Sequence, residues 1–271
     1  MRFWTLGTSA AVATRDRDNL SLLVMAGNER YLVDCSGSPV HKLLKLDCDF
    51  TSLLCVIITH RHPDHIYGLP SLLDSLRIRA SKRLPLPIFA PPEAAKVASD
   101  LLLAFWDKPL LSTLATLTAV PLEENHLLFS SRSVQIFTSP VEHGPETLAV
   151  KFLEQKTGAT LVYSSDTVPS DSIVRLASGA DDLLHDSTFC AEGAEGRPVF
   201  GHSTAKEAGI VARRAGVKRL VLAHFADASA STSECVAEAS REFAGPTIAA
   251  KDFQEFVCGE PDSRQGDHEA Q

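Results

Sequence analysis

Residues 53–65, LLCVIITHRHPDH, decide the fold of this chain. They begin with a continuous apolar run at 53–59, rich in β-branched residues, which predicts a strand buried on both faces. Four potential metal ligands follow at once: His60, His62, Asp64 and His65. Because Pro63 prevents a regular helix from continuing across it, we expect a loop that presents these side chains at the C-terminal end of the strand.

Three imidazoles and one carboxylate within six residues indicate a metal site. Alternate residues of an extended loop point the same way, so we expect His60, His62 and Asp64 on one side and His65 turned toward a neighbouring position. Imidazole nitrogens with a carboxylate are typical of a hydrolytic zinc site that keeps one position open for water. The alternative is a surface cluster of polar loop residues.

The rest of the chain alternates strand-like runs with helical patterns. Further strands are predicted at 22–25, 30–34, 133–138, 149–153, 160–163, 182–184 and 219–223, and helices at 69–79, 92–106, 167–178, 204–215 and 233–243. Thr204 and Glu207 fit a capping box at the start of one of these helices. Strands and helices mixed in both halves, with no long internal repeat and no Pro-, Gly- or Ser-rich linker, indicate α/β layers in one compact unit.

The composition is that of a globular protein, with 44% hydrophobic and 22% charged residues among 271. This excludes collagen-like, low-complexity and wholly disordered classes. No run of about 18 apolar residues occurs, so no membrane-spanning segment is expected. Residues 1–13 resemble a secretion signal only faintly, since Gly7 and its polar neighbours interrupt the apolar core. The net charge of −8 argues against indiscriminate nucleic-acid binding but leaves room for a local basic groove.

The six cysteines form no C-x-x-C pair and lie mostly in apolar runs. We therefore expect buried free thiols in a reducing cytosol, rather than disulfides or sulfur-bound metal. The residues are Cys35, Cys48, Cys55, Cys190, Cys235 and Cys258.

Together these motifs resemble the metallo-β-lactamase superfamily and, within it, the ribonuclease Z branch. Residues 58–73, ITHRHPDHIYGLPSLL, are similar to that branch's metal loop and following helix, and residues 31–37, YLVDCSG, to its second hairpin. Residues 183–189, LLHDSTF, resemble its HEAT-type segment. Residues 2–23 resemble its opening strands, and residues 201–225 its terminal helix and last ligand strand.

This resemblance covers nearly the whole chain and implies a four-layer αβ/βα sandwich with two similar halves. Residues 1–258 would form a single domain and residues 259–271 a disordered tail. The resemblance also implies two zinc ions per chain, with Mn²⁺ or Fe²⁺ as alternatives, held by seven side chains: His60, His62 and His143 on the first ion, Asp64, His65 and His224 on the second, and Asp166 on both. The last three in chain order, at 143, 166 and 224, follow predicted strands, whose ends gather at one edge of a layered α/β protein.

Two such metals lower the pKa of a bridging water and hold both the attacking and the leaving oxygen, which suits hydrolysis of phosphodiesters, lactams, lactones or thioesters. Asp64, His202 and Asp186 are the expected catalytic residues. His202 precedes the helix start at Thr204, where free N–H groups favour an anion, and can donate to a phosphate oxygen or a leaving alkoxide. Asp186 would orient His202, as the acidic residue of the HEAT-type segment does in the branch. Ordinary pre-capping and turn roles are the alternatives for the two residues.

The sequence departs from the ribonuclease Z pattern in three places. Asp186 stands where the branch has Glu and is one methylene shorter, which leaves open whether its orienting contact to His202 is direct, bridged by water or lost. Only 22 residues separate His143 from Asp166, enough for two strands and a turn but not for the long arm that grips the tRNA elbow. The Arg-Tyr pair that commonly follows the last histidine is absent after His224.

The leading hypothesis is a cytoplasmic, dinuclear zinc hydrolase of phosphodiesters that processes tRNA 3′ ends or cleaves small phosphodiesters. A small-molecule hydrolase of cyclic nucleotides, lactones or similar esters is the alternative, and a metal- or RNA-binding protein without catalysis is the third. The resemblance implies a homodimer. The composition indicates that the chain has no membrane partner. Two basic clusters either contact RNA or are solvated helix faces. They are Arg77, Arg79, Lys82 and Arg83, and Arg213, Arg214, Lys218 and Arg219.

Overall fold

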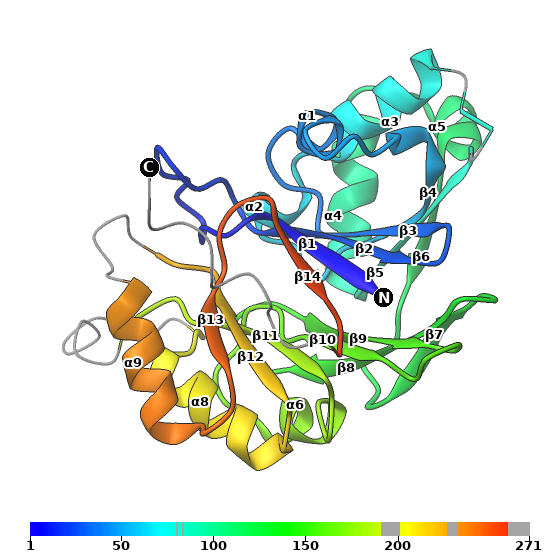
Figure 1. Cartoon of the computed structure of the whole chain (residues 1–271). Coiled ribbons are helices and arrows are strands. Elements are labelled where there is room, and N and C mark those ends of the chain that lie inside the picture. Colours follow the sequence, from blue (N-terminus) through cyan, green and yellow to red (C-terminus); the bar gives the residue numbers. More distant parts are fainter. Residues whose placement is uncertain (80, 83, 191–200, 227–231, 260–271) are drawn as a thin grey trace, which may run out of the picture.

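The computed structural model describes residues 1–79, 81–82, 84–190, 201–226 and 232–259 (Figure 1). Within these residues two seven-stranded sheets pack face to face, and helices cover the outer face of each sheet. The predicted four-layer sandwich is therefore confirmed. Apart from Gly259, the predicted tail at 259–271 lies outside the described residues.

The first sheet has the strand order β14-β1-β2-β3-β4-β5-β6. Neighbours from β14 to β3 are antiparallel and neighbours from β3 to β6 are parallel. The strands are β1 Arg2–Gly7, β2 Ser21–Ala26, β3 Glu29–Val33, β4 Leu53–Ile57, β5 Leu86–Ala90, β6 Ala115–Ala119 and β14 Gln254–Val257.

The second sheet has the order β13-β12-β11-β10-β9-β8-β7. Its pairings repeat the pattern of the first, antiparallel from β7 to β10 and parallel from β10 to β13. The strands are β7 His126–Ser130, β8 Val134–Val141, β9 Thr147–Glu154, β10 Thr160–Tyr163, β11 Asp182–Asp186, β12 Arg219–Ala223 and β13 Thr247–Ala249. The two halves are thus similar, as expected, although β14 reaches the first sheet from the far end of the chain.

Helices flank the two sheets in separate layers (Figure 1). On the side of the first sheet are α1 Pro39–Leu44, the 3-10 turn η1 Phe50–Ser52, α2 Pro63–Ile66, α3 Leu69–Ile78, α4 Pro92–Leu103 and α5 Lys108–Leu114. On the side of the second are α6 Asp171–Leu176, α8 Ala205–Ala215 and α9 Thr232–Glu242. No helix among the described residues is long and apolar enough to cross a membrane.

Apolar side chains fill three interfaces, because alternate residues of a strand face opposite sides of its sheet. Phe3, Tyr31 and Phe152 pack between the two sheets. Leu72 and the residues around it pack α3 onto the first sheet, and Val211 is part of the cluster between α8 and the second sheet.

The predicted capping box at the start of α8 is confirmed. The Glu207 amide donates to the Thr204 hydroxyl over 3.2 Å, and the Thr204 amide donates to the Glu207 carboxylate over 2.8 Å. These bonds satisfy two of the N–H groups that a helix start leaves unpaired. The capping box therefore fixes the start of α8, three residues after His202.

Two predictions of local structure need correction. Pro63 is the first residue of the short helix α2, so Asp64 and His65 lie on a helical turn and not on an extended loop. Proline suits this position because the first helical N–H has no partner to lose. The helix predicted at 167–178 is confined to Asp171–Leu176, since the amides of Thr167 and Val168 bond outside any helix.

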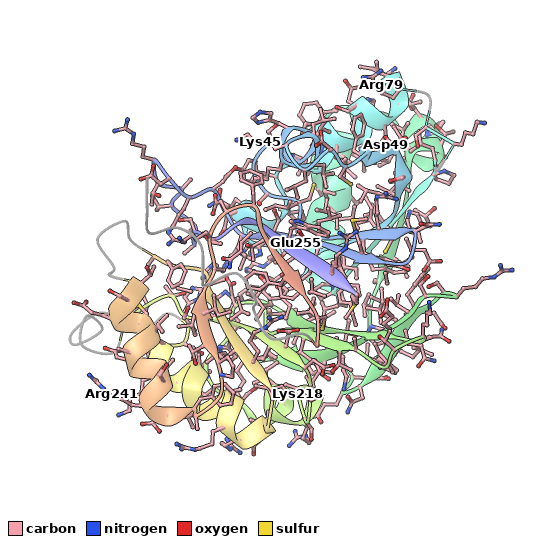
Figure 2. All side chains as sticks on the ribbon, in the orientation of Figure 1. Lys45, Asp49, Arg79, Lys218, Arg241 and Glu255 are labelled. Carbon is pink, nitrogen blue, oxygen red and sulfur yellow. A yellow bond between two sulfur atoms is a disulfide. The ribbon has the colours of Figure 1, made fainter. Side chains whose placement is uncertain are left out.

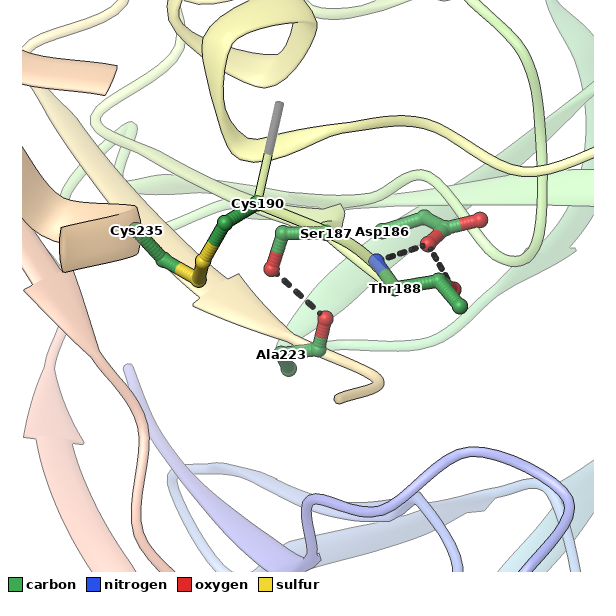
Figure 3. The surroundings of a disulfide bond; sticks show 6 residues. All are labelled: Asp186, Ser187, Thr188, Cys190, Ala223 and Cys235. Carbon is green, nitrogen blue, oxygen red and sulfur yellow. Dashed lines mark hydrogen bonds between the residues drawn. A yellow bond between two sulfur atoms is a disulfide. The ribbon is translucent and has the colours of Figure 1, made fainter. Parts of the chain in front are cut away.

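The prediction that all cysteines are free thiols is wrong for one pair. Cys190 and Cys235 form a disulfide that joins the segment after β11 to helix α9 (Figure 3). Their separation of 45 residues follows no local motif, so only the fold brings them together. The other four, Cys35, Cys48, Cys55 and Cys258, are free and buried as expected.

The short segment between His143 and Asp166 forms two strands and a turn, as predicted. It contains β9 and β10, joined by a turn at 155–159, and no additional arm.

Candidate metal centre

The predicted ligands follow strand ends at one edge of the sandwich. His60 comes three residues after β4, Asp166 three after β10, His143 two after β8, and His224 directly after β12. Because β10, β11 and β12 are parallel neighbours, their carboxyl ends lie side by side. Binding sites of α/β proteins form at such carboxyl ends.

A first group of side chains brings three imidazoles together. The Nδ1 of His62 lies 3.0 Å from the Nε2 of His60 and 3.2 Å from the Nε2 of His143. A carboxylate oxygen of Asp166 lies 3.5 Å from His60 Nε2 and 3.9 Å from His143 Nε2. These four residues form one cluster able to hold a metal ion.

A second group lies on the other side of Asp166. The Nε2 of His65 is 3.3 Å from Asp64 Oδ2 and 3.4 Å from Asp166 Oδ2. The Nε2 of His224 is 3.3 Å from Asp166 Oδ1. Asp64, His65 and His224 form a further candidate metal cluster. Asp64 therefore groups with His65, and our expectation that it would converge with His60 and His62 is wrong, because the turn of α2 redirects it.

Several polar atoms of these groups are buried without a hydrogen-bond partner. They are Nε2 of His65, Nε2 of His224 and Oδ1 of Asp166. Buried polar atoms are almost always satisfied, so each exception needs a cause. The donor atoms lie near the ~3.3 Å separation of neighbouring ligands around a tetrahedral ion with ~2.0 Å bonds. Both the donor types and their spacing fit divalent metal ions.

In His65, His143 and His224, the ring nitrogen that faces away from the cluster, Nδ1, contacts a further group that was not predicted from the sequence. Asp34 Oδ2 accepts from His65 Nδ1 at 2.8 Å, and the Gly201 carbonyl accepts from His143 Nδ1 at 2.8 Å. The Thr188 hydroxyl lies 2.8 Å from His224 Nδ1. Such outer contacts fix which ring nitrogen faces a metal. Asp34 lies in the YLVDCSG motif, but nothing local in that motif indicates its partner.

The backbone at the site adopts conformations that are costly for ordinary residues. Asp34, Ser165 and His224 have φ values of 58°, 57° and 66°. Non-glycine residues in the left-handed region concentrate at functional sites. Gly201, with φ 81°, is required for a second reason, since a Cβ there would lie 2.8 Å from His143 Nδ1.

The charges of the site are strongly coupled. Burial holds the pKa of His60 well below its usual value, and the neighbouring His65 contributes a smaller lowering. Burial opposes a charge on His65, but Asp166 and Asp34 outweigh it and raise the pKa of His65 well above its usual value. Asp166 likewise overcomes burial to raise the pKa of His224 to about 8. At neutral pH the metal-free site thus keeps protons that a bound cation would replace, so metal affinity increases with pH.

His202 and Asp186 form a direct pair beside these groups. His202 Nδ1 lies 2.9 Å from Asp186 Oδ2, so the shorter residue makes the direct contact that the sequence left open. The Thr188 hydroxyl donates to Asp186 Oδ1 over 2.6 Å while contacting His224, which links the pair to the last predicted ligand. The His202 ring stacks on that of His224 at a centroid distance of 5.1 Å.

These side chains also offer an alternative metal arrangement. Asp166, Asp186, His202 and His224 place ligand atoms close enough to form a third candidate cluster. Asp186 already engages Nδ1 of His202, however, and its own oxygens accept from Thr188 and from the Thr167 amide.

The two basic clusters lie away from each other, with Arg79 and Lys218 at opposite ends of the molecule (Figure 2). The second is largely neutralised, since Arg213 pairs with Glu242 and Lys218 with Asp181. In the first, Arg77 pairs with Asp74, and Arg83 lies outside the described residues. Solvated helix faces explain most of these charges.

Comparison with known proteins agrees with this geometry. Residues 29–225 match the family model described as the beta-lactamase superfamily domain. A ribonuclease Z of Mycobacterium bovis is 33% identical over 257 residues, covering 89% of this chain and 92% of that protein. The chain belongs to the ribonuclease Z family of the beta-lactamase superfamily. The ribonuclease Z of Methanothermobacter thermautotrophicus is 28% identical over 92% of this chain and 94% of its own length.

Solved structures share the fold. The short form of human tRNase Z has a TM-score of 0.77 at 24% identity, with 95% of this chain and 99% of that chain covered. The metallo-beta-lactamase fold protein YhfI from Bacillus subtilis gives 0.77 at 21% identity, with 94% and 98% covered. The predicted family, fold and enzyme class, a metal-dependent hydrolase of phosphodiester bonds, are thereby confirmed.

The role of Asp34 leads to a stability prediction. Its carboxylate is fully buried and accepts from the amide and hydroxyl of Thr59 as well as from His65. We expect Asp34→Ala to lower the free energy of unfolding of the EDTA-treated protein by about 3–5 kcal/mol, because it leaves a buried charge and two donors unpaired. Urea denaturation measures this. Asp100→Ala, which removes an exposed partner of Lys96, is the control, with an effect under about 1 kcal/mol. Equal effects of both variants would contradict the assigned role.

Proposed function

We propose that this chain is a dinuclear zinc-dependent endonuclease of the ribonuclease Z type that cleaves RNA phosphodiesters at tRNA 3′ ends. The observation that carries the proposal is the convergence of six side chains from both sheets around the buried carboxylate of Asp166, on a chain whose relatives are named ribonuclease Z. Because each half contributes to the cluster, we propose that residues 1–258 act as one domain.

The proposed ligand sets follow the two clusters. His60, His62 and His143 would hold one zinc ion, Asp64, His65 and His224 a second, and Asp166 both; Mn²⁺ or Fe²⁺ are alternatives. When bound, such ions activate water as a nucleophile and neutralise charge that develops on a phosphodiester. Asp166 is placed for sharing, since its Oδ2 lies near both His60 and His65 and its Oδ1 lies near His224.

In this proposal His202 is the proton donor and Asp186 its positioning residue. Asp186 accepts from Nδ1 of His202, which leaves Nε2 to deliver a proton to the leaving oxygen. Burial opposes ionisation of Asp186, but hydrogen bonds from His202 and His224 outweigh it and lower the pKa of this carboxyl. A carboxylate that stays ionised fixes the tautomer of the imidazole that it contacts. Asp64, beside His65, is proposed to act through its place in the second cluster.

An RNA substrate does not require the missing arm. The alignments to the Mycobacterium bovis ribonuclease Z and to a Synechococcus ribonuclease Z both cover about nine-tenths of this chain. The first alignment is 257 residues long and the second 317. The Synechococcus relative therefore carries inserted residues that this chain lacks and that the M. bovis relative largely lacks too. The small-molecule alternative rested on the missing arm and is not favoured by any of these relatives.

The proposal also includes a homodimer and a cytoplasmic location. Family membership supports the homodimer. The four buried free thiols support a cytoplasmic location, where thiols stay reduced.

The ligand assignment predicts close to two zinc ions per chain by elemental analysis after loading and desalting. We expect Asp166→Ala to reduce occupancy of both sites and His143→Ala mainly that of the first. His126→Ala, which changes a half-buried histidine of β7 outside the clusters, should keep both ions. At most one tightly bound ion, unchanged in His224→Ala, would contradict a dinuclear site.

The proton-donor assignment predicts that His202→Ala lowers kcat on bis(p-nitrophenyl) phosphate by about 10²- to 10⁴-fold, while zinc content stays near that of the unchanged protein. Asp186→Asn should lower kcat less, because it acts through His202. Loss of zinc in proportion to activity in His202→Ala would instead indicate ligation in the third candidate cluster.

The charge distribution predicts how RNA binding depends on salt. Small phosphodiesters need only the site itself, so their hydrolysis should be measurable at all salt concentrations. Cleavage of a 3′-extended pre-tRNA should fall steeply with salt and be slow or lost at about 150 mM, because the chain's charge is −8 and Arg77 and the second basic cluster are paired with acidic groups. Efficient site-specific cleavage at that salt, surviving charge reversal at Arg77, Arg79, Lys82 and Arg83, would contradict this.

A further inference from the structure

The disulfide between Cys190 and Cys235 encloses the proposed proton-donor end of the site. Cys190 lies four residues after Asp186, and the chain between the two cysteines contains both His202 and His224. Cys235 is fully buried in the first turns of α9, whereas Cys190 retains 9% of its exposure. Figure 3 shows the bridge beside the segment that carries Asp186 and Thr188.

That segment is fixed to the site at its beginning. The amide and hydroxyl of Ser187 both donate to the Ala223 carbonyl, each over 2.9 Å, next to His224. Thr188 donates through its amide and its hydroxyl to Asp186 Oδ1, and its carbonyl accepts from Ala226. Any shift of residues 187–190 would therefore move the groups that orient Asp186 and His224.

The end of the segment is fixed by the disulfide. Phe189 pairs with Thr204, and its carbonyl accepts from the Ala205 amide over 2.8 Å, so it joins the start of α8 close to His202. The next residue, Cys190, is covalently attached to α9. Helix α9 is itself packed tightly on α8, since a Cβ at Gly209 would lie 2.5 Å from the Ala239 carbonyl. The bridge thus ties the Asp186–Thr188 segment to the helix pair that begins next to His202.

We propose that Cys190–Cys235 is a redox modification site, a tether opened by thiol–disulfide exchange with a dithiol reductant, which lowers turnover by loosening the Asp186–His202 pair. The inference rests on the roles proposed above for these two residues. Disulfides of reducing compartments are typically transient and regulatory, which suits a bridge placed beside a site and not in a core far from it.

The exchange balances without a further reactant. A thiolate of the reductant attacks Sγ of Cys190, the more exposed sulfur, and breaks the bond to Cys235, whose thiolate takes up a proton. The second thiol of the reductant then attacks the mixed disulfide and releases Cys190 as a thiol. Two electrons and two protons pass to the cysteine pair, and the reductant leaves as a disulfide. A small disulfide such as oxidised glutathione reverses the reaction.

The effect should fall on turnover more than on metal content. Six of the seven proposed ligands lie outside the loop that the bridge closes. The seventh, His224, directly follows β12, which is paired on both sides by β11 and β13. His202, in contrast, precedes α8 and relies on Asp186 for its orientation.

The test compares oxidised and reduced zinc-loaded protein on bis(p-nitrophenyl) phosphate, with a phosphine reductant because dithiols bind zinc. Intact mass after thiol alkylation confirms each redox state, and zinc is measured in both. We expect reduction to lower kcat about tenfold at unchanged zinc content and to lower Tm by roughly 10 °C. The double variant Cys190→Ala, Cys235→Ala should match the reduced protein and be insensitive to reductant. Cys48→Ala, which removes a buried free thiol, should stay redox-sensitive.

Equal kcat in the two confirmed redox states would overturn the inference, as would reductant sensitivity that persists in the double variant. Failure of the proposed function is distinguishable, because zinc-loaded protein would then be inactive in both states. If the protein is inactive in both states, hydrogen exchange of residues 183–189 and 205–212 tests the tether instead. Amide protection that is the same in the oxidised and reduced protein would overturn the inference.

Discussion

The buried carboxylate of Asp166, surrounded by imidazoles and with one oxygen that makes no hydrogen bond, holds the site together and constrains the surrounding fold. Burial disfavours its ionised form, yet His224, His65 and His60 outweigh burial and hold its pKa well below the usual value. Such a cluster persists only where the surrounding fold fixes each member. The two sheets achieve this by ending β4, β8, β10 and β12 at a common edge, and the outer contacts of Asp34, Thr188 and Gly201 set the rings. Metal cations bound there would coordinate the buried atoms that lack hydrogen bonds and would neutralise the charge of the Asp166 carboxylate.

Local patterns in the sequence predicted the parts of the fold whose cause is local. The apolar run before His60 became β4, the amphipathic patterns became α3, α8 and α9, and the Thr204–Glu207 box caps α8. Strands β5, β6, β7, β13 and β14 were not predicted. Pro87 interrupts the pattern of β5, and β14 is a four-residue edge strand that begins with two polar residues. Such strands are specified by their neighbours, not by their own periodicity.

In the candidate site, too, local motifs were predictable from the sequence and contacts between distant residues were not. The histidines and aspartates were found from motif spacing, and the family resemblance implied the same two groups that the structure brings together. The loop spacing alone placed Asp64 wrongly with His60 and His62. Asp64 changes cluster because Pro63 starts a helix where the sequence suggested an extended loop. Asp34 and the Cys190–Cys235 bridge escaped prediction because each depends on a contact between residues at least 30 positions apart. The His202–Asp186 contact could not be judged from side-chain length alone, since the backbone after β11 sets the distance.

We propose that two metal ions, one in each histidine cluster, share the carboxylate of Asp166. Anomalous X-ray diffraction from crystals of the zinc-loaded protein, collected on both sides of the zinc absorption edge, tests it most directly. We expect two anomalous peaks, one contacting His60, His62 and His143, the other Asp64, His65 and His224, with an oxygen of Asp166 bound to each. A single peak, or a second peak that uses His202 and Asp186 in place of Asp64 and His65, would contradict it.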